Sequence, residues 1–491
     1  MIKKSGALVI VVSIVAVCLS FENATHIVPS KKTAGHSKNS AENTTLLADA
    51  AVNYKNYCAG CHGEKMDMFV DRNWKHGNKK EDLFKTIKFG VANDGMPSFG
   101  ESLSDAAVNA LADYILTGIK NVAKYTAKER PTSDVFKTQA MTIKLEMVAK
   151  GFNVPWGIAF LPGGEMLVTD RGGKFYLVKK DQSLVEVSGA PQVLAKGQGG
   201  LMDVALDPDF ATNRYIYLSY SKFKEGGGAV LATTAIMKAK FEGNQLTEQK
   251  DIFVAEPYQP TQHHYGSRMQ FGKDGYLYFS VGERGNERVN PQEIKGNDLG
   301  KIHRIKRDGS IPADNPFVKT AGAEASIYSY GHRNPQGLTM NPETGKIWEN
   351  EHGPRGGDEI NIVEPGKNYG WPVITYGINY NGKPMSNLTA KAGMEQPVHY
   401  WIPSIGPSGL AFVTGTKYKG WEGNLLSGSL RFEFLQRTVL KASKVVKEEL
   451  MFKNIGRVRD VRMAPDGFIY MAVESPGRIY KLVPITENMR N

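Results

Sequence analysis

The stretch MAPDGFIYMAVE at residues 463–474 places a Pro-Asp-Gly turn between an apolar residue and a strand-forming run. Such a turn beside alternating apolar residues is typical of a β-hairpin. The same theme recurs five times: FLPGGEMLVTD (160–170), LDPDFATNRYIYLSY (206–220), FGKDGYLYFSVGE (271–283), MNPETGKIWENE (340–351) and, more loosely, FVTGTKYKGWEGNLLSGSL (412–430). Six occurrences predict an all-β six-bladed propeller of four-stranded antiparallel blades over residues 139–491. A pair of sandwiches would not explain one theme recurring six times.

The bulk composition is that of a globular protein with more than one domain. The chain has 491 residues, of which 41% are apolar and 23% charged, and two or three domains are expected for this length. Its formal net charge is +11, but the basic residues are scattered and form no aromatic-interleaved patch. We therefore expect no nucleic-acid partner.

The first residues predict export. Lys3 and Lys4 precede an apolar run at residues 7–19, which is too short to span a bilayer comfortably but fits a signal-peptide core. We expect a signal peptide at residues 1–24 and a periplasmic protein. An uncleaved anchor stays open, and so does lipidation of Cys18, although Val17 is large for a lipoprotein signal. Membrane contact is expected only if this end is retained or lipidated.

Two polar segments divide the rest of the chain. Residues 25–44 are small and polar without periodicity and predict a flexible linker, and the charged residues 121–138 predict a second one. The residues between them, 45–120, form a compact segment with an amphipathic helix near its end. That helix is expected to begin after Ser104 as N-cap and to stop at Gly118, with these apolar residues on one face: Val108, Leu111, Ala112 and Ile115.

The compact segment contains the motif YCAGCHGEK at residues 57–65. Cys58 and Cys61 flank two residues and His62 follows at once, which is typical of covalent haem c attachment with the histidine as an axial ligand. A thiol–disulfide pair or half a zinc site are the alternatives. The adjacent histidine, the export signal and the lack of a second cysteine pair disfavour both.

A second axial ligand is expected from the stretch NDGMPSFG, which offers Met96 as a soft thioether. A histidine–methionine pair leaves no open iron position and suits electron transfer. The haem motif after a first helix, the methionine loop and the closing helix resemble class I c-type cytochromes. The segment 45–120 is therefore predicted to be a small all-α cytochrome c domain.

Several stretches of the propeller carry more polar chemistry than a propeller needs to fold. TQHHYGSRMQFG holds His264, YGHRNPQGL holds Arg333 and Asn334, and GRVRDVRM holds Arg457 and Arg459. The last two arginines are spaced by two, so they point to one face of a strand. A single histidine or arginine is more often structural, but arginines converging with a histidine on a propeller axis would recognise a polyanion.

These stretches, in this order, resemble the soluble quinoprotein glucose dehydrogenase family and especially its aldose sugar dehydrogenase branch. The resemblance covers residues 145–485 and also rests on the following stretches: VPWGIAFLPGGEMLVTDRGGKFYLV, GQGGLMDVALDPDF, GPRGGDEIN and NYGWP. It implies a sugar substrate, pyrroloquinoline quinone (PQQ) and Ca²⁺ on the propeller axis.

The resemblance also assigns roles to residues. It implies that His264 is the general base and that Gln198 and Arg333 lie in the same catalytic site. It also implies that the quinone is held by five residues: Arg333, Asn334, Arg431, Arg457 and Arg459. It implies cofactor calcium on the carbonyls of Gly353 and Pro354, and a second, structural calcium site that includes Asp358, Glu359 and the Tyr369 carbonyl. Oxygen ligands of this kind suit Ca²⁺ better than zinc.

Three positions depart from the glucose-oxidising members. His263 stands where they have aspartate, Arg431 where they have lysine, and GERG, with Glu283 and Arg284, where they have GDQG. These changes leave the expected cofactor residues in place and put the identity of the substrate in doubt.

The sequence thus predicts an enzyme that oxidises an aldose at C1 to its lactone and passes electrons singly through its own haem to an external acceptor. Two alternatives stay open. One is a PQQ-dependent sorbosone, aldehyde or alcohol dehydrogenase, since loop residues set substrate choice. The other is a propeller without cofactor that binds a carbohydrate or a partner.

Overall fold

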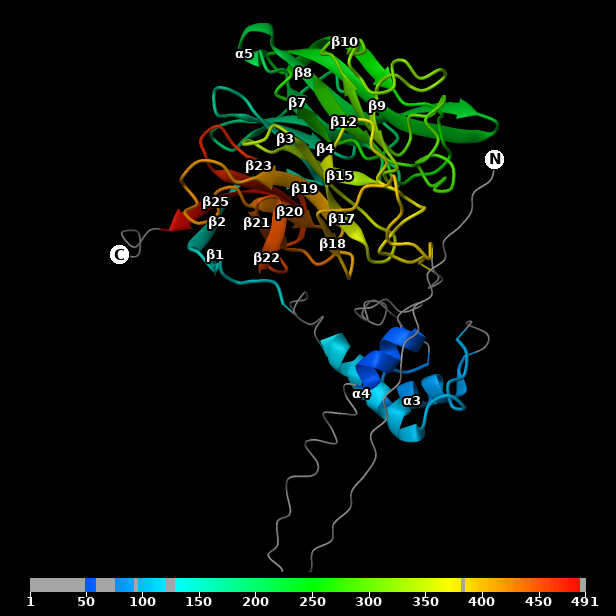
Figure 1. Cartoon of the computed structure of the whole chain (residues 1–491). Coiled ribbons are helices and arrows are strands. Elements are labelled where there is room, and N and C mark those ends of the chain that lie inside the picture. Colours follow the sequence, from blue (N-terminus) through cyan, green and yellow to red (C-terminus); the bar gives the residue numbers. More distant parts are fainter. Residues whose placement is uncertain (1–48, 59–75, 92–95, 121–128, 381–384, 486–491) are drawn as a thin grey trace, which may run out of the picture. The chain divides into compact units, whose positions relative to one another are not determined.

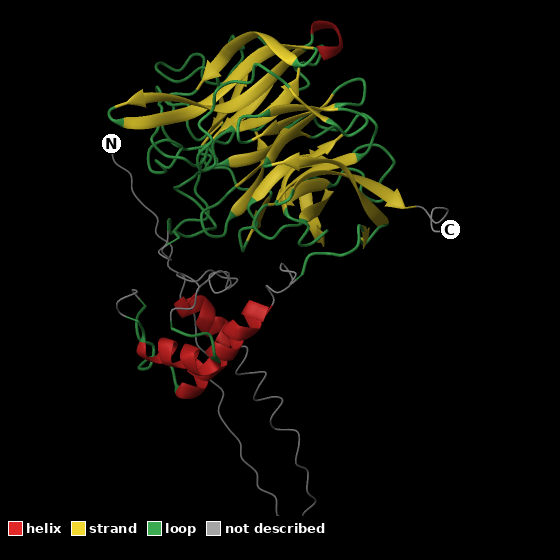
Figure 2. Cartoon of the chain, turned by 180° about the vertical axis from the view of Figure 1, so that it is seen from behind, coloured by secondary structure: helices red, strands yellow, loops and turns green. Residues whose placement is uncertain are grey.

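The computed structural model describes residues 49–58, 76–91, 96–120, 129–380 and 385–485, and it contains a helical N-terminal part and a β-propeller (Figure 1). The two parts differ sharply in secondary structure (Figure 2). Within the described residues, no helix combines the length and the apolar character needed to cross a membrane. The expected signal peptide, the first linker, Cys61 and His62 lie outside the described residues, so these expectations stay predictions.

The helical part has a small apolar core. Its elements are a helix at residues 49–53 that continues as η1 (Tyr54–Cys58), α3 (Lys80–Phe89) and α4 (Asp105–Lys120). The four apolar residues expected on one face of α4 are at most 2% exposed, and the Ser104 hydroxyl accepts a hydrogen bond from Ala107 N at 3.2 Å, so that face and the N-cap are confirmed. The expected stop at Gly118 is wrong by two residues, because a helix tolerates one glycine at a cost of about 1 kcal/mol.

The propeller consists of six sheets, so the predicted number of blades is confirmed. Blade 1 is β3 (Pro155–Phe160), β4 (Met166–Asp170), β5 (Phe175–Val178) and β6 (Leu184–Glu186). Blade 2 is β7 (Leu201–Leu206), β8 (Tyr215–Gly226), β9 (Ala229–Glu242) and β10 (Gln245–Val254), with α5 (Phe210–Asn213) between its first two strands. Blade 3 is β11 (Met269–Phe271), β12 (Leu277–Val281), β13 (Lys301–Ile305) and β14 (Ile327–Tyr330).

The remaining blades follow the same order from the axis outward. Blade 4 is β15 (Pro335–Met340), β16 (Ile347–Glu351), β17 (Asp358–Val363) and β18 (His399–Trp401). Blade 5 is β19 (Pro407–Phe412), β20 (Leu425–Ser429), β21 (Leu435–Lys441) and β22 (Lys444–Met451). Each of the six recurrent sequence stretches forms the turn between the first and second strands of one blade, which is why the theme recurs once per blade.

Blade 6 closes the ring with strands from both ends of the propeller. It contains β23 (Arg457–Met463), β24 (Ile469–Glu474) and β25 (Gly477–Ile485), and then β2 (Thr142–Phe152) and β1 (Val135–Lys137) from the start of the domain. Figure 1 shows β2 beside β25, and Thr142 pairs with Ile485. Part of the segment expected as the second linker is therefore a strand: β1 pairs with β2.

Apolar clusters fill the space between neighbouring blades. One cluster joins blades 1 and 2 through residues such as Phe175 and Leu218, and another joins blades 4 and 5 through Trp348 and Phe412. The cluster that joins blade 6 to blade 1 includes Phe152 of the closing strand β2. Because successive side chains alternate between the two faces of a sheet, each blade can bury both faces against its neighbours.

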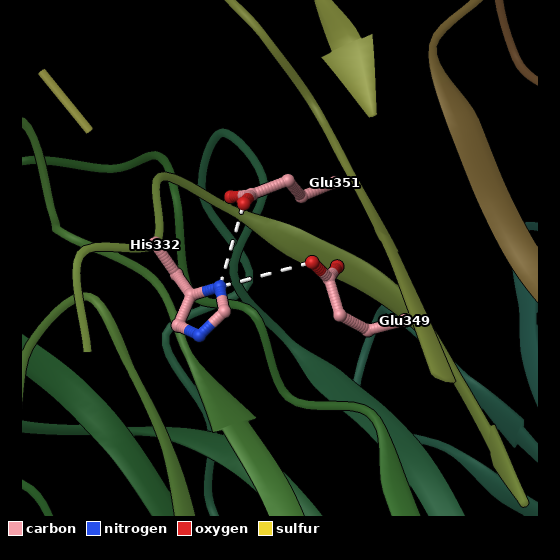
Figure 3. A group of neighbouring side chains, drawn as sticks. All are labelled: His332, Glu349 and Glu351. Carbon is pink, nitrogen blue, oxygen red and sulfur yellow. Dashed lines mark hydrogen bonds and ion pairs between the residues drawn. The ribbon is translucent and has the colours of Figure 1, made fainter. Parts of the chain in front are cut away.

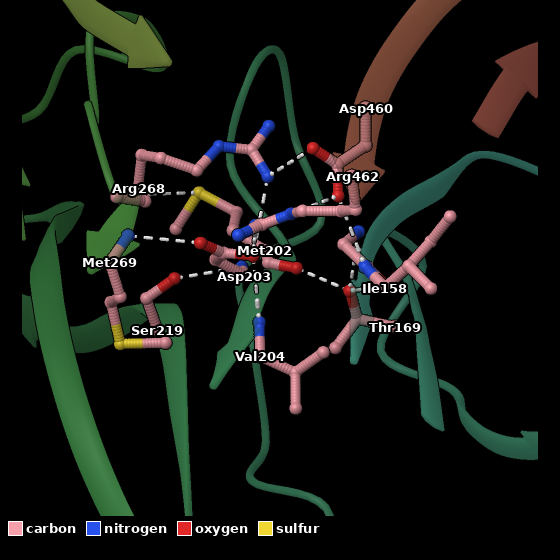
Figure 4. Close-up of polar contacts among 12 residues, drawn as sticks. Ile158, Thr169, Met202, Asp203, Val204, Ser219, Arg268, Met269, Asp460 and Arg462 are labelled. Atoms are coloured by element: carbon pink, nitrogen blue, oxygen red, sulfur yellow. Dashed lines mark hydrogen bonds and ion pairs between the residues drawn. The ribbon is translucent and has the colours of Figure 1, made fainter. Parts of the chain in front are cut away.

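A charged network fills the axis where the inner strands converge (Figure 4). Arg268 Nη1 donates to Asp203 Oδ1 at 3.2 Å and to Asp460 Oδ1 at 3.0 Å. Arg462 donates to the same two carboxylates, from Nη2 at 2.7 Å and from Nε at 2.9 Å. The Arg268 guanidinium also lies 4.2 Å from the ring centroid of Trp156. The network joins blades 1, 2, 3 and 6 and has no net charge.

We expect Asp203→Ala to destabilise the propeller by about 3–5 kcal/mol, because it leaves two buried guanidinium groups with one carboxylate partner each instead of two. Asp209→Ala is the matched control, since Asp209 is 63% exposed and its ion pair with Arg307 is at the surface; it should cost less than about 1 kcal/mol. Chemical denaturation of the full chain measures both. Equal losses in the two variants would contradict the role given to the axial network.

Candidate active site

A cavity of about 540 Å³ lies on the propeller axis. The inner strand of each blade, or the loop that leads to it, contributes to its wall, through these residues: Trp156, Met202, Tyr265, Gln336, Gly406 and Arg459. Five charged side chains line the cavity, four arginines and one carboxylate, which give it a net charge of +3. They are Arg171, Arg431, Arg457, Arg459 and Glu474. The cavity is therefore suited to an anion.

Arg457 and Arg459 lie on one face of β23, as their spacing predicted, and share Glu474 as a partner. Arg457 Nε donates to Glu474 Oε2 at 2.9 Å and Arg459 Nε donates to Oε1 at 2.6 Å. Burial alone would raise the pKa of Glu474, but the two guanidinium charges outweigh it and lower that pKa. Glu474 thus holds both arginines at the cavity wall, and Arg459 Nη1 reaches Gln336 Oε1 at 3.2 Å.

The expected base His264 is paired with a buried carboxylate. Its Nδ1 is hydrogen-bonded to Glu283 Oε1, and its side chain keeps 11% of its surface exposed. Tyr265 and Gly266, the next two residues, line the axial cavity. Among the described residues no group bonds to Nε2 of His264, so this nitrogen is left for a ligand.

Burial sets the protonation of this pair. It lowers the pKa of His264 well below 6.5, assisted by the charge of Arg333, and it raises the pKa of Glu283 to about 7. Since the two groups share a hydrogen bond, they titrate as a unit. With Glu283 ionised, Nδ1 of a neutral His264 donates to the carboxylate and Nε2 has a free lone pair, which is the form that a general base needs.

The loop 197–200 positions the backbone next to the base. Gln198 Oε1 accepts a hydrogen bond from His264 N at 2.8 Å, so the structure brings together two of the expected site residues. Gly197 has φ +59°, and a Cβ there would lie 2.2 Å from the Gln262 carbonyl oxygen. His264 itself has φ +57°, a left-handed conformation that is uncommon for a residue with a side chain and is often found at functional sites.

Arg333 and Asn334 do not line the axial cavity themselves, but they bond to His352 and Gly266, which do, and they hold the loop after β16. Arg333 Nη1 donates to the carbonyl oxygens of His352 at 3.2 Å and Gly353 at 2.6 Å, whereas its buried Nε has no partner among the described residues. Asn334 Oδ1 accepts from Gly266 N at 3.1 Å. These two residues therefore link the loop that carries the base to the loop of Gly353.

Asp358 holds the Gly353 loop in a tight turn. Its Oδ1 accepts from Gly353 N at 2.8 Å and from the Ser404 hydroxyl at 2.9 Å, and its Oδ2 accepts from Gly406 N at 2.8 Å. A Cβ on Gly353 would lie 2.2 Å from the Gly357 carbonyl oxygen, so only glycine fits there. A second cavity of about 190 Å³ adjoins the loop and is lined by residues that include Gly353, Pro354, Asp358 and Arg431.

The structure does not bring Asp358 and Glu359 together. They are consecutive on β17 and so point to opposite faces. Asp358 contacts the Gly353 loop, whereas Glu359 Oε2 accepts from Asn361 Nδ2 at 3.2 Å on the other face. Tyr369 lies on the side of Glu359, where its ring stacks on His332 with centroids 4.5 Å apart. If a second cation site exists here, Asp358 is not on the same side of the sheet as the other two expected ligands.

Two functional carboxylates escaped the sequence reasoning. In the sequence Glu283 is visible only as a departure in GERG, and its position two residues after β12 is the available signal for a site residue. Glu474 ends β24, far in sequence from the base, and nothing local to it indicated a cationic partner. Both acquire these partners only through contacts made by the closed ring.

Two residues of the expected haem site, Cys58 and Met96, lie among the described residues and share one core. Cys58 is 5% exposed in the apolar core of the helical part, and Met96 packs against the same core. The backbone of Met96 is fixed by two hydrogen bonds to Val91, at 2.9 and 3.1 Å. The expected thioether at Cys61 and the axial ligand His62 lie outside the described residues.

Fold and site together define a class of protein: a six-bladed β-propeller with a cationic cavity on its axis, next to a buried histidine–glutamate pair. Residues 152–481 match the family Glucose / Sorbosone dehydrogenase. The chain belongs to this family and is an oxidoreductase. Residues 45–115 match the family Cytochrome C oxidase, cbb3-type, subunit III, so the helical part is a cytochrome c domain.

Individual relatives are similar over the propeller. Aldose sugar dehydrogenase YliI of Escherichia coli (strain K12) is 42% identical over 349 residues, which cover 70% of this chain and 93% of that protein. The crystal structure of the soluble aldose sugar dehydrogenase from Escherichia coli in the apo-form has 40% identity and a TM-score of 0.66, and covers 70% of this chain and 100% of that one. The PQQ-bound form of the aldose sugar dehydrogenase from Streptomyces coelicolor has 30% identity and a TM-score of 0.57, and covers 70% and 97%.

The pH dependence of substrate oxidation should report the His264–Glu283 pair. Below a pH of about 7, protonated Glu283 would donate to Nδ1 and leave the proton of His264 on Nε2, where it blocks the base. We expect kcat/KM to rise with pH through about 7. Glu283→Gln should abolish this rise and lower kcat by at least about tenfold. An unchanged pH profile in this variant would show that another group controls the rate.

Proposed function

We propose that the protein is an exported quinohaemoprotein that oxidises an aldose at C1 to its lactone, using PQQ and Ca²⁺. Electrons would leave one at a time through haem c to an external acceptor, a cytochrome or another respiratory-chain component. The observation that carries this proposal is the His264–Glu283 pair beside a cavity of net charge +3. The names of the relatives, aldose sugar dehydrogenases of which one was solved with PQQ, support the same substrate and cofactor.

The residues of the axial cavity fit PQQ, which is a tricarboxylate. The net charge of the lining balances three carboxylates, and guanidinium groups bind carboxylates in bidentate fashion. Arg457 and Arg459 share one carboxylate, so their donors are not all used within the protein. The buried, unpaired Nε of Arg333 is a further donor at the border of the site.

The Gly353 loop fits a calcium ion that accompanies the quinone. Backbone carbonyls are hard oxygen ligands of the kind that Ca²⁺ prefers. The Gly353 carbonyl accepts from Arg333 Nη1 and keeps a second lone pair for a cation. Gly353 and Pro354 both line the smaller cavity next to Arg431, and Asp358 fixes the backbone that carries them. Bound PQQ would supply the two-electron acceptor, and Ca²⁺ would polarise its reactive carbonyl.

The chain's own residues supply the base and its orientation. His264 Nε2 accepts the proton of the C1 hydroxyl, while Glu283 holds the ring and stabilises the imidazolium that forms. Gln198 fixes the backbone of the base from the opposite loop. The hydrogen on C1 leaves with both electrons, so the aldose becomes a lactone. The arginines of the cavity stabilise the negative charge that the cofactor gains.

Export and the haem pathway rest on the sequence. The apolar run at residues 7–19 supports a signal peptide and hence a periplasmic location. The CxxCH motif with Met96 supports covalent haem c with two axial ligands. A linker that includes residues 121–128 would keep the haem domain at a high effective concentration near the propeller.

The function is tested by giving the haem-containing full chain a panel of aldoses and recording the reduction of its haem band. We expect reduction only after PQQ and Ca²⁺ are added. His264→Ala should slow it by about 100- to 10,000-fold, since that is the usual contribution of a general base. Sugar binding with no haem reduction under any condition would instead favour a binding module, and reduction by sorbosone or alcohols but not by aldoses would change the substrate class.

The haem as outlet is tested by the double variant Cys58→Ala and Cys61→Ala, which removes both thiols and should prevent covalent haem attachment. We expect this variant to keep sugar oxidation with an artificial two-electron acceptor and to lose the reduction of an external cytochrome. Asp134→Ala, an exposed change at the start of the propeller, should leave both activities unchanged. Cytochrome reduction at the wild-type rate by the haem-free variant would remove the haem from the electron path.

A further inference from the structure

A second polar cluster lies on the blade 4 side of the loop that holds Arg333. It consists of His332, between β14 and β15, and of Glu349 and Glu351 on β16 (Figure 3). All three side chains are buried, with residue exposures of 0%, 0% and 4%. One potential ligand atom from each lies within 4.8 Å of those of the other two. The cluster is separate from the Gly353 and Pro354 carbonyls of the cavity.

The distances within the cluster are too long for good hydrogen bonds. His332 Nδ1 lies 3.4 Å from Glu351 Oε1 and 3.7 Å from Glu349 Oε1, whereas N–H···O bonds measure about 2.7–3.2 Å. Ligand atoms about 2.1 Å from a metal ion lie roughly 3.0 Å apart at right angles and roughly 3.4 Å apart in a tetrahedron. The observed spacing is therefore closer to that of ligands around one ion than to that of an imidazolium bonded to a carboxylate.

The cluster also lacks compensating charge. Among the described residues, no lysine or arginine forms an ion pair with Glu349, Glu351 or Glu359. Asn361 Nδ2 is shared between these carboxylates. It lies 2.8 Å from Glu349 Oε1, 3.5 Å from Glu351 Oε1 and 3.2 Å from Glu359 Oε2. Glu349 Oε2 and Asn361 Oδ1 are both buried and have no hydrogen-bond partner, although their residues are 0% and 1% exposed. Unpaired buried polar atoms are costly and point to a missing ligand.

The imidazole of His332 is held as a metal ligand usually is. Its Nε2 is 2.8 Å from the Ser329 hydroxyl, and its ring stacks on Tyr369 with an interplanar angle of 22°. A metal-bound histidine commonly uses its second nitrogen in this way, which fixes the tautomer and directs the first nitrogen to the ion. Nδ1 is thereby directed toward the two glutamates.

We propose that His332, Glu349 and Glu351 bind a divalent cation, with Asn361 Oδ1 as a further ligand once its amide is turned. One imidazole nitrogen among carboxylate oxygens favours Mn²⁺ or Zn²⁺ over Ca²⁺, which prefers oxygen ligands alone. Rotating the Asn361 amide by half a turn would direct its Oδ1 to the cation. The carboxylates would then have the cation as their partner in place of the amide hydrogens.

The ion would support the cofactor site from behind. Glu351 Oε2 accepts the backbone N–H groups of Arg333 at 2.6 Å and of Asn334 at 3.2 Å. A cation that fixes Glu351 therefore also fixes the loop that carries both residues. The metal site itself does not depend on the proposed sugar oxidation, and its occupancy can be measured without any substrate.

The test is metal binding by the chelator-treated full chain, with Ca²⁺ kept saturating so that sites for Ca²⁺ do not contribute. Wild type should bind one Mn²⁺ by equilibrium dialysis, or one Zn²⁺ in a parallel experiment. Glu349→Gln should weaken this binding at least roughly 100-fold, because even outer partners of a metal ligand contribute about 10- to 100-fold. Glu343→Gln, an exposed change in the same blade, is the control and should bind as wild type does.

His332→Gln provides a second variant in case Glu349→Gln does not fold, and it should lose the same equivalent of metal. Equal Mn²⁺ and Zn²⁺ binding by wild type and both variants would overturn the proposal. So would a wild type that binds neither ion in the presence of Ca²⁺. A Glu349→Gln protein with a higher Tm than wild type and no response to metal would show that the cluster holds only protons.

Discussion

The structure depends on how charge is buried where the inner strands meet. Asp203, Asp460, Arg268 and Arg462 form a closed set of four ion pairs with no net charge. A buried charge is tolerated only when it is paired and fully hydrogen-bonded, and backbone N–H groups of Ile158 and Met269 complete the set. Because the network neutralises itself, it takes no charge from the cavity, whose arginines keep a positive excess for an anion.

The same low-polarity surroundings determine the chemistry of the base. Burial, assisted by the charge of Arg333, lowers the pKa of His264 and keeps its imidazole neutral and able to accept a proton. The raised pKa of Glu283 is the other side of this effect, since a buried carboxyl group resists ionisation. Burial thus favours the neutral form of both groups, whatever their residue types.

Much of the fold could be predicted because its signals are local. Each hairpin turn is encoded within about a dozen residues, and one theme per blade was enough to count the blades. The closing strand β2 could not be predicted in this way, since its partner β25 lies at the other end of the domain and no local pattern specifies that pair. The roles of Glu283 and Glu474 were missed for the same reason. The expected calcium site at Asp358 and Glu359 stays a prediction, but strand alternation places these two neighbours in sequence on opposite faces of β17.

The closure of blade 6 also has a consequence for the order of events during synthesis. Strand β2 is translated first among the main strands, but the edge that it completes is translated last. Until residues 477–485 emerge, β2 lacks the long partner strand β25 that makes it part of blade 6. The nascent chain therefore carries a strand whose only sheet partner is the short β1 for almost the whole of propeller synthesis. Such a strand is prone to wrong pairing, and its protection until closure is a requirement that this domain order places on the cell.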